Sequence, residues 1–201
     1  MLTVLKNTYP VHPMGDLTRG NPYRVLVACI LSLRTKDEVS IPASERLFVH
    51  AETPEKMVTL PAETIEKLIY PVGFYKNKTK NILNFSTVIL DQFEGKVPDT
   101  IDGLLTLTGV GRKTANLVMS LGYNQPAICV DVHVHRICRR MGYLNEKTPD
   151  DTEYALREKL PKPYWQMINT VMVLHGQQIC RPISPKCGIC PVEKTCSKHL
   201  E

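Results

Sequence analysis

Four of the seven cysteines in this chain lie within its last 22 residues. They are Cys180, Cys187, Cys190 and Cys196, with six, two and five residues between them. Four thiolates on one short loop can bind a tetrahedral zinc ion or the irons of a 4Fe-4S cluster. Zinc sites usually consist of two tight cysteine pairs, and only one tight pair is present here. The uneven spacing therefore favours the iron–sulfur cluster over zinc, and both over unligated surface thiols.

Two basic residues, Arg181 and Lys186, lie between the first two of these cysteines. Basic side chains on a loop closed by a metal group would suit contacts with phosphates. The equally weighted alternative is that they offset the negative charge of the cluster or stay in solvent.

A second pattern, Leu-Thr-Gly-Val-Gly at residues 107–111, joins two expected helices. Gly109 and Gly111 let the backbone take positive φ and leave their amides unobstructed by Cβ atoms. Before a helix N-terminus, such amides can hold a phosphate through hydrogen bonds and the helix dipole. Most turns of this kind only redirect the chain, so the residues that follow carry more weight.

Arg112 and Lys113 come next, in the first turn of the following helix, where cations oppose the helix dipole. A bound phosphate would resolve that conflict for Arg112. For Lys113, the positive helix end together with burial would favour the neutral amine. A lysine becomes a good nucleophile only when its pKa falls from about 10.4. The alternative is a surface lysine that tolerates this position.

Asp131 opens the expected helix Asp-Val-His-Val-His-Arg and belongs to the residue types preferred at helix N-caps. A cap would hold its carboxylate rigid and ionised, so a structural role and a chemical role are compatible. His133 and His135 are two residues apart on a helix and therefore point to different faces. We interpret His133 as adjacent to the site and His135 as structural.

The composition limits the function classes only mildly. Hydrophobic residues make up 43% and charged residues 22% of the chain, as in ordinary globular proteins, and the net charge of +5 permits a polyanionic partner. The longest apolar stretch, residues 25–33, is far shorter than the ~20 residues of a membrane helix, and the N-terminus lacks a signal-peptide pattern. We expect a cytoplasmic protein without membrane contact. In that reducing compartment, clustered cysteines bind metals rather than pair.

Apolar side chains recur with a helical period along nearly the whole chain, which predicts an all-α fold. The remaining cysteines, Cys29, Cys129 and Cys138, are expected to be core residues in apolar helical surroundings. Short helical segments open at Pro54 and Pro61. Longer helices are expected over about residues 22–33, 37–49, 75–93, 98–107, 112–122, 131–141, 150–160 and 164–179.

The combination of these patterns closely resembles the endonuclease III family of helix-hairpin-helix DNA glycosylases. The resemblance is carried by residues 107–115, by Val-Asp-Val-His at 130–133 and by the four cysteines, with weaker similarity over 30–37 and 70–75. It implies two helical lobes flanking a DNA-binding cleft. One lobe is a six-helix barrel of residues 16–124, and the other, which holds the 4Fe-4S cluster, joins residues 1–15 to residues 125–201.

The resemblance also implies an enzyme of base-excision DNA repair, a bifunctional DNA glycosylase and abasic-site lyase. Lys113 would attack C1′ of a nucleotide flipped out of double-stranded DNA, and Asp131 would stabilise charge and move protons. The hairpin and the cysteine loop would bind phosphates, and the cluster would be structural. Oxidised pyrimidines are the implied substrates, and we expect a nucleoid-associated monomer.

Two residues depart from the family pattern. Arg34 replaces a glutamine that is thought to fill the gap left by the flipped base; it could take that role, or it could be a favourable cation at a helix C-terminus. Val132 replaces a threonine, so one hydroxyl near Asp131 is absent. Both changes bear on lesion preference more than on reaction type.

Two other functions remain open at this stage. A mismatch or uracil glycosylase would share the fold without the lyase step, although such relatives commonly lack a lysine at position 113. A non-catalytic nucleic-acid-binding protein would use the hairpin and the cluster only as architecture. A charged segment outside these motifs is either a phosphate-contacting edge or a solvated face; it contains Tyr75, Lys76, Lys78 and Lys80.

Overall fold

The structure, a computed structural model, describes residues 1–9, 17–18 and 20–200. The chain divides into two compact units, a central unit of residues 13–125 and a terminal unit that joins residues 1–12 to residues 126–201. Every regular element in the described residues is helical, which confirms the predicted all-α class. The expected boundary between residues 15 and 16 lies outside the described residues.

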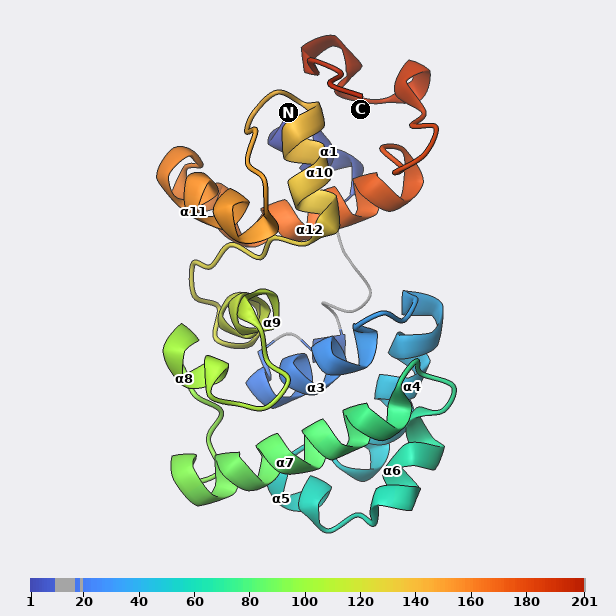
Figure 1. Cartoon of the computed structure of the whole chain (residues 1–201), viewed down its shortest axis with the longest axis vertical. Helices are drawn as coiled ribbons and strands as arrows, with labels where there is room; N and C mark the ends of the chain where they lie inside the picture. Colours follow the sequence, from blue (N-terminus) through green and yellow to red (C-terminus); the bar gives the residue numbers. More distant parts are fainter. Residues whose placement is uncertain (10–16, 19, 201) are drawn as a thin grey trace. The chain divides into compact units, whose positions relative to one another are not determined.

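The central unit is arranged around helix α3, which contacts α4, α7, α9 and the short π-helix η1 (Figure 1). Each of these neighbours covers a different part of its surface. The bounds are α3 Pro22–Ser32, α4 Asp37–His50, α5 Pro54–Val58, α6 Ala62–Ile69, α7 Tyr75–Phe93, α8 Ile101–Leu105, α9 Arg112–Leu117 and η1 Val118–Gly122.

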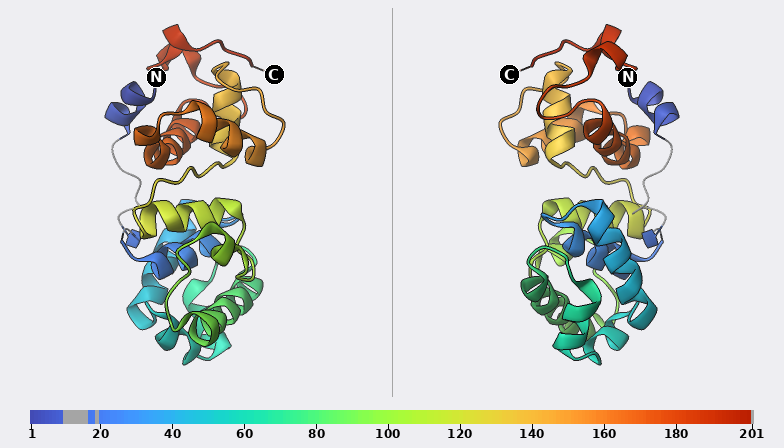
Figure 2. Two further views of the ribbon diagram at one scale, coloured as in Figure 1. Left: turned by 90° about the vertical axis from the view of Figure 1, so that its left-hand side faces the viewer. Right: turned by 90° about the vertical axis from the view of Figure 1, so that its right-hand side faces the viewer.

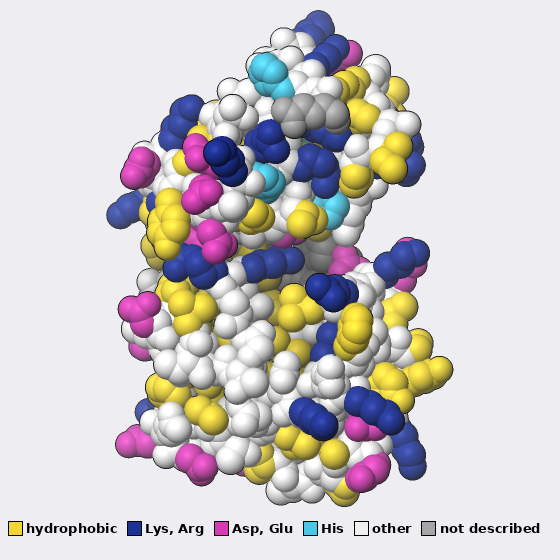
Figure 3. All heavy atoms as spheres, viewed as in Figure 1, with side chains coloured by type: hydrophobic (Ala, Val, Ile, Leu, Met, Phe, Trp, Pro, Cys, Tyr) yellow, Lys and Arg dark blue, Asp and Glu magenta, His cyan; other side chains and the backbone are white. Residues whose placement is uncertain are grey.

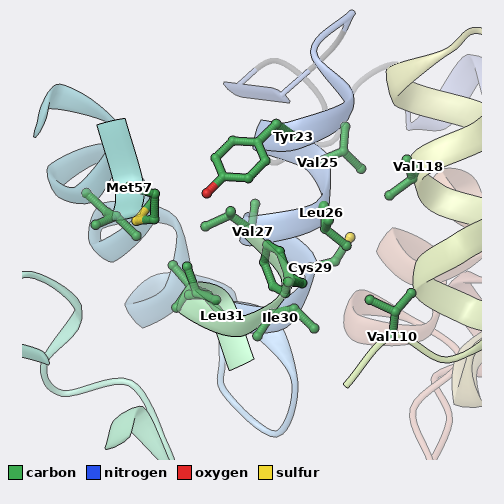
Figure 4. Close-up of a cluster of buried hydrophobic side chains, with 14 of the residues drawn as sticks. Tyr23, Val25, Leu26, Val27, Cys29, Ile30, Leu31, Met57, Val110 and Val118 are labelled. Carbon is green, nitrogen blue, oxygen red and sulfur yellow. The ribbon is translucent and has the colours of Figure 1, made fainter. Parts of the chain in front are cut away.

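Helix α3 is apolar on all sides because it is enclosed by its neighbours. Tyr23 and every residue from 25 to 31 are buried. In Figure 4, Val25 lies on the side of Val118, whereas Tyr23 lies on the side of Met57. Full burial of one large aliphatic side chain contributes roughly 1.5–3 kcal/mol, so this helix supplies much of the unit's packing energy.

Helix α7 shows the apolar stripe that its sequence predicts. Ile82, Phe85 and Ile89 recur at helical spacing and are buried, and the helix packs on α3, α5 and α6. A buried hydrogen bond of 2.6 Å between the Tyr23 hydroxyl and Ser86 Oγ joins α7 to α3. The long helix therefore forms a rigid base for the residues at its N-terminal end.

The terminal unit packs α10 and α1 on α12, with α11 beside α10. The N-terminus and the C-terminal cysteine loop lie at the same end of this unit in Figures 1 and 2. Its core is formed by apolar residues of all these helices, among them Leu5, Ile137 and Val171. The bounds are α1 Leu2–Thr8, α10 Val132–Arg140, α11 Pro149–Lys159, η2 Lys162–Tyr164, α12 Trp165–Gln178, η3 Cys187–Ile189 and η4 Glu193–Thr195.

Several predicted boundaries differ from the structure. The helix expected from residue 98 begins at Ile101, because the Thr100 side chain accepts a hydrogen bond from the backbone N–H of Gly103 and caps it. The helix expected over 112–122 changes from α to π geometry at Val118. Helix α1 was not predicted; it is seven residues long and lacks a side-chain cap, so it depends on packing against α12.

Among the described residues, none of the helices combines the length and the apolar character needed to cross a membrane.

The N-cap of α3 provides a test of how this central helix is fixed. The Asn21 side chain accepts a hydrogen bond from the backbone N–H of Arg24 at 3.0 Å. Asn21→Ala should lower the free energy of unfolding by about 1 kcal/mol, measured by urea denaturation followed by circular dichroism. Asn77→Ala, at an exposed position inside α7, is the matched control and should change it by less than about 0.5 kcal/mol. Equal losses of unfolding free energy in both variants would show that the Asn21 cap does not stabilise the protein more than an ordinary exposed residue does.

Candidate functional site

The four C-terminal cysteines line one cavity in the terminal unit. Cys180, Cys187, Cys190 and Cys196 surround it together with Arg140 and His175. The loop between them is held in two short 3-10 turns, η3 and η4. Within the part of the chain that the structure describes, no three histidine, cysteine or acidic side chains are grouped as a site for a single metal ion.

Two hydrogen-bond donors and one histidine nitrogen lie against three of these sulfurs. Arg140 Nη1 lies 3.7 Å from Cys180 Sγ, and the backbone N–H of Lys198 lies 3.4 Å from Cys196 Sγ. Buried His175 has its Nε2 3.7 Å from Cys190 Sγ. Donors around sulfur stabilise the thiolate form that binds metals.

Burial raises the pKa of the Cys190 thiol, and the neighbouring cysteines Cys180, Cys196 and Cys187 raise it further. Clustered thiolates repel one another, so a positively charged metal group is the natural means of keeping them ionised together. The four sulfurs of the cavity could therefore serve as metal ligands, and a bound metal group would relieve their mutual repulsion.

Two arginines one turn apart on α10 fix the start of the cysteine loop. Arg136 Nη2 donates to the carbonyl of Cys180 at 2.9 Å, and Arg140 donates to the carbonyls of Arg181 and Pro182 at 2.6 and 2.7 Å. Neither arginine was predicted from the sequence as a site residue. The only sequence feature that could have indicated them is their i, i+4 spacing on an amphipathic helix.

The predicted phosphate-binding residues of this loop, Arg181 and Lys186, are both exposed. In Figure 3, lysine, arginine and histidine side chains gather on the face shown of the unit that contains α10 to α12. Both loop residues therefore have the exposure that a phosphate contact requires. The same exposure fits their alternative role in solvent.

The other three cysteines are buried, as predicted. Burial raises the pKa of Cys29 and that of Cys138 to about 12, so both stay protonated thiols at neutral pH. One detail differs from the prediction. Cys129 lies in the connection before α10 rather than in a helix.

The hairpin in the central unit uses its two glycines differently. Gly109 has φ +83°, and a Cβ there would lie 2.6 Å from Asn81 Nδ2, so both the backbone and the neighbouring side chain require glycine. Gly111 has φ −102° and ψ 176°, an extended conformation open to any residue. The predicted need for positive φ is therefore wrong at Gly111. No neighbouring atom lies within 4 Å of the place its Cβ would occupy, which leaves that side of the backbone accessible.

Arg112 and Lys113 occupy the first turn of α9, as predicted, with Gly111 as an N-cap that has no capping side chain. The positive charge of Lys113 partly offsets the effect of burial on the pKa of Cys29, which places the lysine near that thiol. Lys113 itself is exposed. The expected burial of this amine is therefore wrong, because the first turn of α9 lies at the surface of the helix bundle.

Asp131 caps α10, as predicted. It is only 8% exposed, and its Oδ1 accepts hydrogen bonds from the backbone N–H groups of His133 and Val134, both at 2.9 Å. These two bonds hold the carboxyl group in one orientation. Lys113 belongs to the central unit and Asp131 to the terminal unit.

The two histidines of α10 face different neighbours. His135 Nδ1 lies 2.7 Å from Thr152 Oγ1 of α11, which agrees with a structural role. His133 lies against α12, where a Cβ on Gly176 would be 2.3 Å from its Nδ1, and the same nitrogen is 3.1 Å from Arg136 Nη2.

Arg34 lies two residues beyond the last helical residue of α3 and is exposed. Its guanidinium lies over the ring of Phe74, 5.9 Å from the ring centre, and its backbone is left-handed with φ 52°. The carbonyls at the end of α3 bind Lys78 instead, whose Nζ donates to Leu31 and Leu33. Lys78 is therefore the cation that binds the end of α3 directly, and both predicted roles of Arg34 stay predictions. Lys78 belongs to the segment predicted as either a phosphate-contacting edge or a solvated face, and its burial fits neither alternative.

Comparison with known proteins gives consistent relatives. A family model described as the HhH-GPD superfamily of base excision DNA repair proteins matches residues 27–162. Endonuclease III of Thermotoga maritima is 42% identical over 176 residues, covering 88% of this chain and 83% of that protein. Endonuclease III homolog 1 of Arabidopsis thaliana is 41% identical over 203 residues, and the chain spans about half of its length, 54%.

Solved structures agree with these relatives. A trapped covalent intermediate of endonuclease III with DNA superposes with a TM-score of 0.88 at 33% identity, covering 98% of this chain and 92% of that one. A non-covalent endonuclease III–DNA complex gives the same TM-score at 34% identity.

Two substitutions of Asp131 separate its role as a helix cap from its negative charge. Asp131→Asn should keep the free energy of unfolding within about 0.5 kcal/mol, because asparagine caps helices as well as aspartate does. Asp131→Ala should lower it by about 1–2 kcal/mol, because two N–H groups lose their acceptor. Denaturant unfolding of the three proteins measures both effects. A loss in the asparagine variant as large as that in the alanine variant would contradict the capping role.

Proposed function

The chain belongs to the endonuclease III family of HhH-GPD base-excision DNA repair proteins, which are DNA glycosylases and abasic-site lyases, and we propose that Lys113 is its nucleophile. The observation that carries this proposal is the position of an exposed lysine in the first turn of α9, directly after the glycine hairpin. A lysine amine is a nucleophile that can form a Schiff base with a sugar carbon.

In the proposed reaction, Lys113 Nζ bonds to C1′ of the extruded nucleotide, the glycosidic bond breaks and the base leaves with a proton. One amine proton goes to the leaving base. The second goes to the ring oxygen O4′ as the C1′–O4′ bond breaks, which opens the sugar and gives a Schiff base between Nζ and C1′. The imine acidifies the C2′ hydrogen. Its removal breaks the bond between C3′ and oxygen, so the strand is cut on the 3′ side and water later releases the lysine.

Asp131 assists these steps by charge and by proton transfer. The cap on α10 holds its carboxylate in one orientation, which a group needs in order to stabilise positive charge on a sugar. The two bonds from α10 keep that orientation without any contribution from the substrate.

We propose that double-stranded DNA with a damaged base or an abasic site is the partner. The accessible backbone at Gly111 and the adjacent Arg112 would hold one phosphate, beside the turn that Gly109 makes possible. Arg181 and Lys186 would hold others, with His133 near the same strand. Extrusion of the nucleotide costs a few kcal/mol, less for a damaged base, and oxidised pyrimidines are the proposed substrates.

The four cysteines of the terminal unit are proposed to hold a 4Fe-4S cluster. All four line one cavity, and the uneven spacing wraps one continuous loop. Donors point at Cys180 and Cys196, and a His175 nitrogen lies 3.7 Å from Cys190 Sγ. When bound, the cluster would supply structural closure of the C-terminus and positive metal charge for the thiolates. The chain's own residues shape the loop, because Arg136 and Arg140 fix its first carbonyls.

Borohydride trapping on a duplex with one abasic site tests the nucleophile. The unchanged protein should form a covalent complex, because borohydride reduces the imine between Nζ and C1′. Lys113→Gln should form none and should lose at least about a thousandfold in strand cleavage. Lys80→Gln, at an exposed position on α7, is the control and should be trapped normally. A complex with Lys113→Gln would assign the nucleophile elsewhere, and no complex with any protein would leave a glycosylase without lyase activity or a binding protein.

The metal group is tested by iron content and visible absorption of the purified protein. We expect about four iron atoms per chain and a broad visible absorption band. Cys190→Ser should lower both and should destabilise the terminal unit. Cys138→Ser is the control, because this buried cysteine of the same unit does not line the cavity. Zinc in place of iron, or full iron content in Cys190→Ser, would contradict the proposed cluster.

A further inference from the structure

Lys78 of α7 is a buried cation bound to the end of another helix. The residue is 5% exposed, and its ammonium donates to the carbonyls of Leu31 and Leu33 at 2.9 and 2.5 Å and to Thr35 Oγ1 at 3.0 Å. An ammonium has three N–H groups, so all of its donors are used. Its partners are neutral oxygens, and burial lowers the pKa of Lys78 to about 8.

This bond set fixes the turn that follows α3. The last carbonyls of a helix have no partner within the helix, and a cation there is favoured by the helix dipole. Lys78 satisfies two of these carbonyls and reaches beyond the helix end to Thr35. Arg34 lies between Leu33 and Thr35, two of the residues that Lys78 binds. Its backbone is left-handed with φ 52°, a conformation in which a non-glycine residue must be held by its surroundings.

Thr35 joins this turn to a second one. The backbone N–H of Gly73 donates to Thr35 Oγ1 at 3.2 Å, and a Cβ on Gly73 would lie 3.2 Å from the carbonyl oxygen of Arg34. The next residue, Phe74, is also left-handed at φ 57° and is 61% exposed. Its ring lies under the Arg34 guanidinium. Two sharp turns therefore meet at Lys78 and Thr35 and present one exposed cation in a defined place.

We propose that Lys78 is a positioning residue, which fixes the turn of residues 33–35 against Gly73 and Phe74 and thereby sets where Arg34 stands when it fills the gap left by the flipped base. The inference rests on the proposed function and on the role that the family resemblance implies for Arg34, that of filling the gap left by the flipped base. Lys78 does not touch DNA in this account, because its donors all point into the protein.

A double-mutant cycle on Arg34 and Lys78 tests this role. Affinity is measured for duplexes that carry a tetrahydrofuran abasic analogue opposite each of the four bases, which needs no lyase chemistry. Arg34→Ala should weaken binding about tenfold and level the differences between opposite bases. Lys78→Met, which keeps the aliphatic stem, should reproduce most of both effects. The double variant should bind no more than about twofold more weakly than Arg34→Ala alone, because the two residues act through one contact.

Lys67→Met is the matched control, since Lys67 is an exposed lysine of the same unit that lies on α6, outside the charged segment of residues 75–80. Its effect should be small, should leave opposite-base differences intact and should add fully to that of Arg34→Ala. Thr35→Val removes only the hydroxyl shared by Lys78 and Gly73 and should behave as Lys78→Met does, including in the Arg34→Ala background. If the melting curve of Lys78→Met shows that this variant does not fold, Thr35→Val replaces it in the test.

Additive losses from Lys78→Met and Arg34→Ala, or wild-type affinity and opposite-base differences in a folded Lys78→Met, would overturn the proposal. Absence of a borohydride adduct with the unchanged protein would instead overturn the lyase function, and the binding cycle would still report on Lys78. The two failures are therefore distinguishable.

Discussion

A helix end leaves backbone N–H or C=O groups without partners inside the helix, and this constraint underlies every part of the site. At the N-terminal ends of α10 and α9, the backbone N–H groups lie next to the side chains that are proposed to take part in the reaction. Asp131 satisfies two of them on α10 and is held as a rigid carboxylate in return. On α9 the cap is Gly111, which has no side chain to offer, so the first turn keeps its positive character next to Lys113. One helix end orients a carboxylate, and the other presents a lysine beside an N-cap without a capping side chain.

The C-terminal ends are satisfied by cations from other helices. Lys78 of α7 binds the last carbonyls of α3, and Arg136 of α10 binds the carbonyls of Gly176 and Cys180 at the end of α12. In both cases the cation does more than complete the helix, because it also fixes the turn that follows. After α3 that turn carries Arg34, and after α12 it carries the cysteine loop. The segments that leave these helices are therefore shaped by a buried lysine in one case and a partly buried arginine in the other.

This division explains what the sequence could and could not predict. Local patterns predicted the helices, the cap at Asp131, the hairpin and the cysteine loop, because each depends on residues a few positions apart. Lys78, Arg140 and His175 were missed because their partners lie far along the chain; Lys78 and Leu31, for example, are 47 residues apart. A charged residue in a polar stretch looks solvated until the fold buries it. The same limit accounts for Lys113, where helix position was predictable but exposure depended on how the bundle closes around α9.

The departure at Val132 can be weighed on the same grounds. Its side chain is 66% exposed, at the first position of α10, and the bonds that hold Asp131 come from the backbone of the two residues after it. Backbone donors are the same for any residue at position 132 except proline, so replacing a threonine there leaves the orientation of the carboxylate unchanged. What a hydroxyl at this position would add is a donor and an acceptor on the exposed surface beside Asp131. The substitution therefore alters the polarity of the exposed surface next to the carboxylate and leaves the bonds that hold the carboxylate in place.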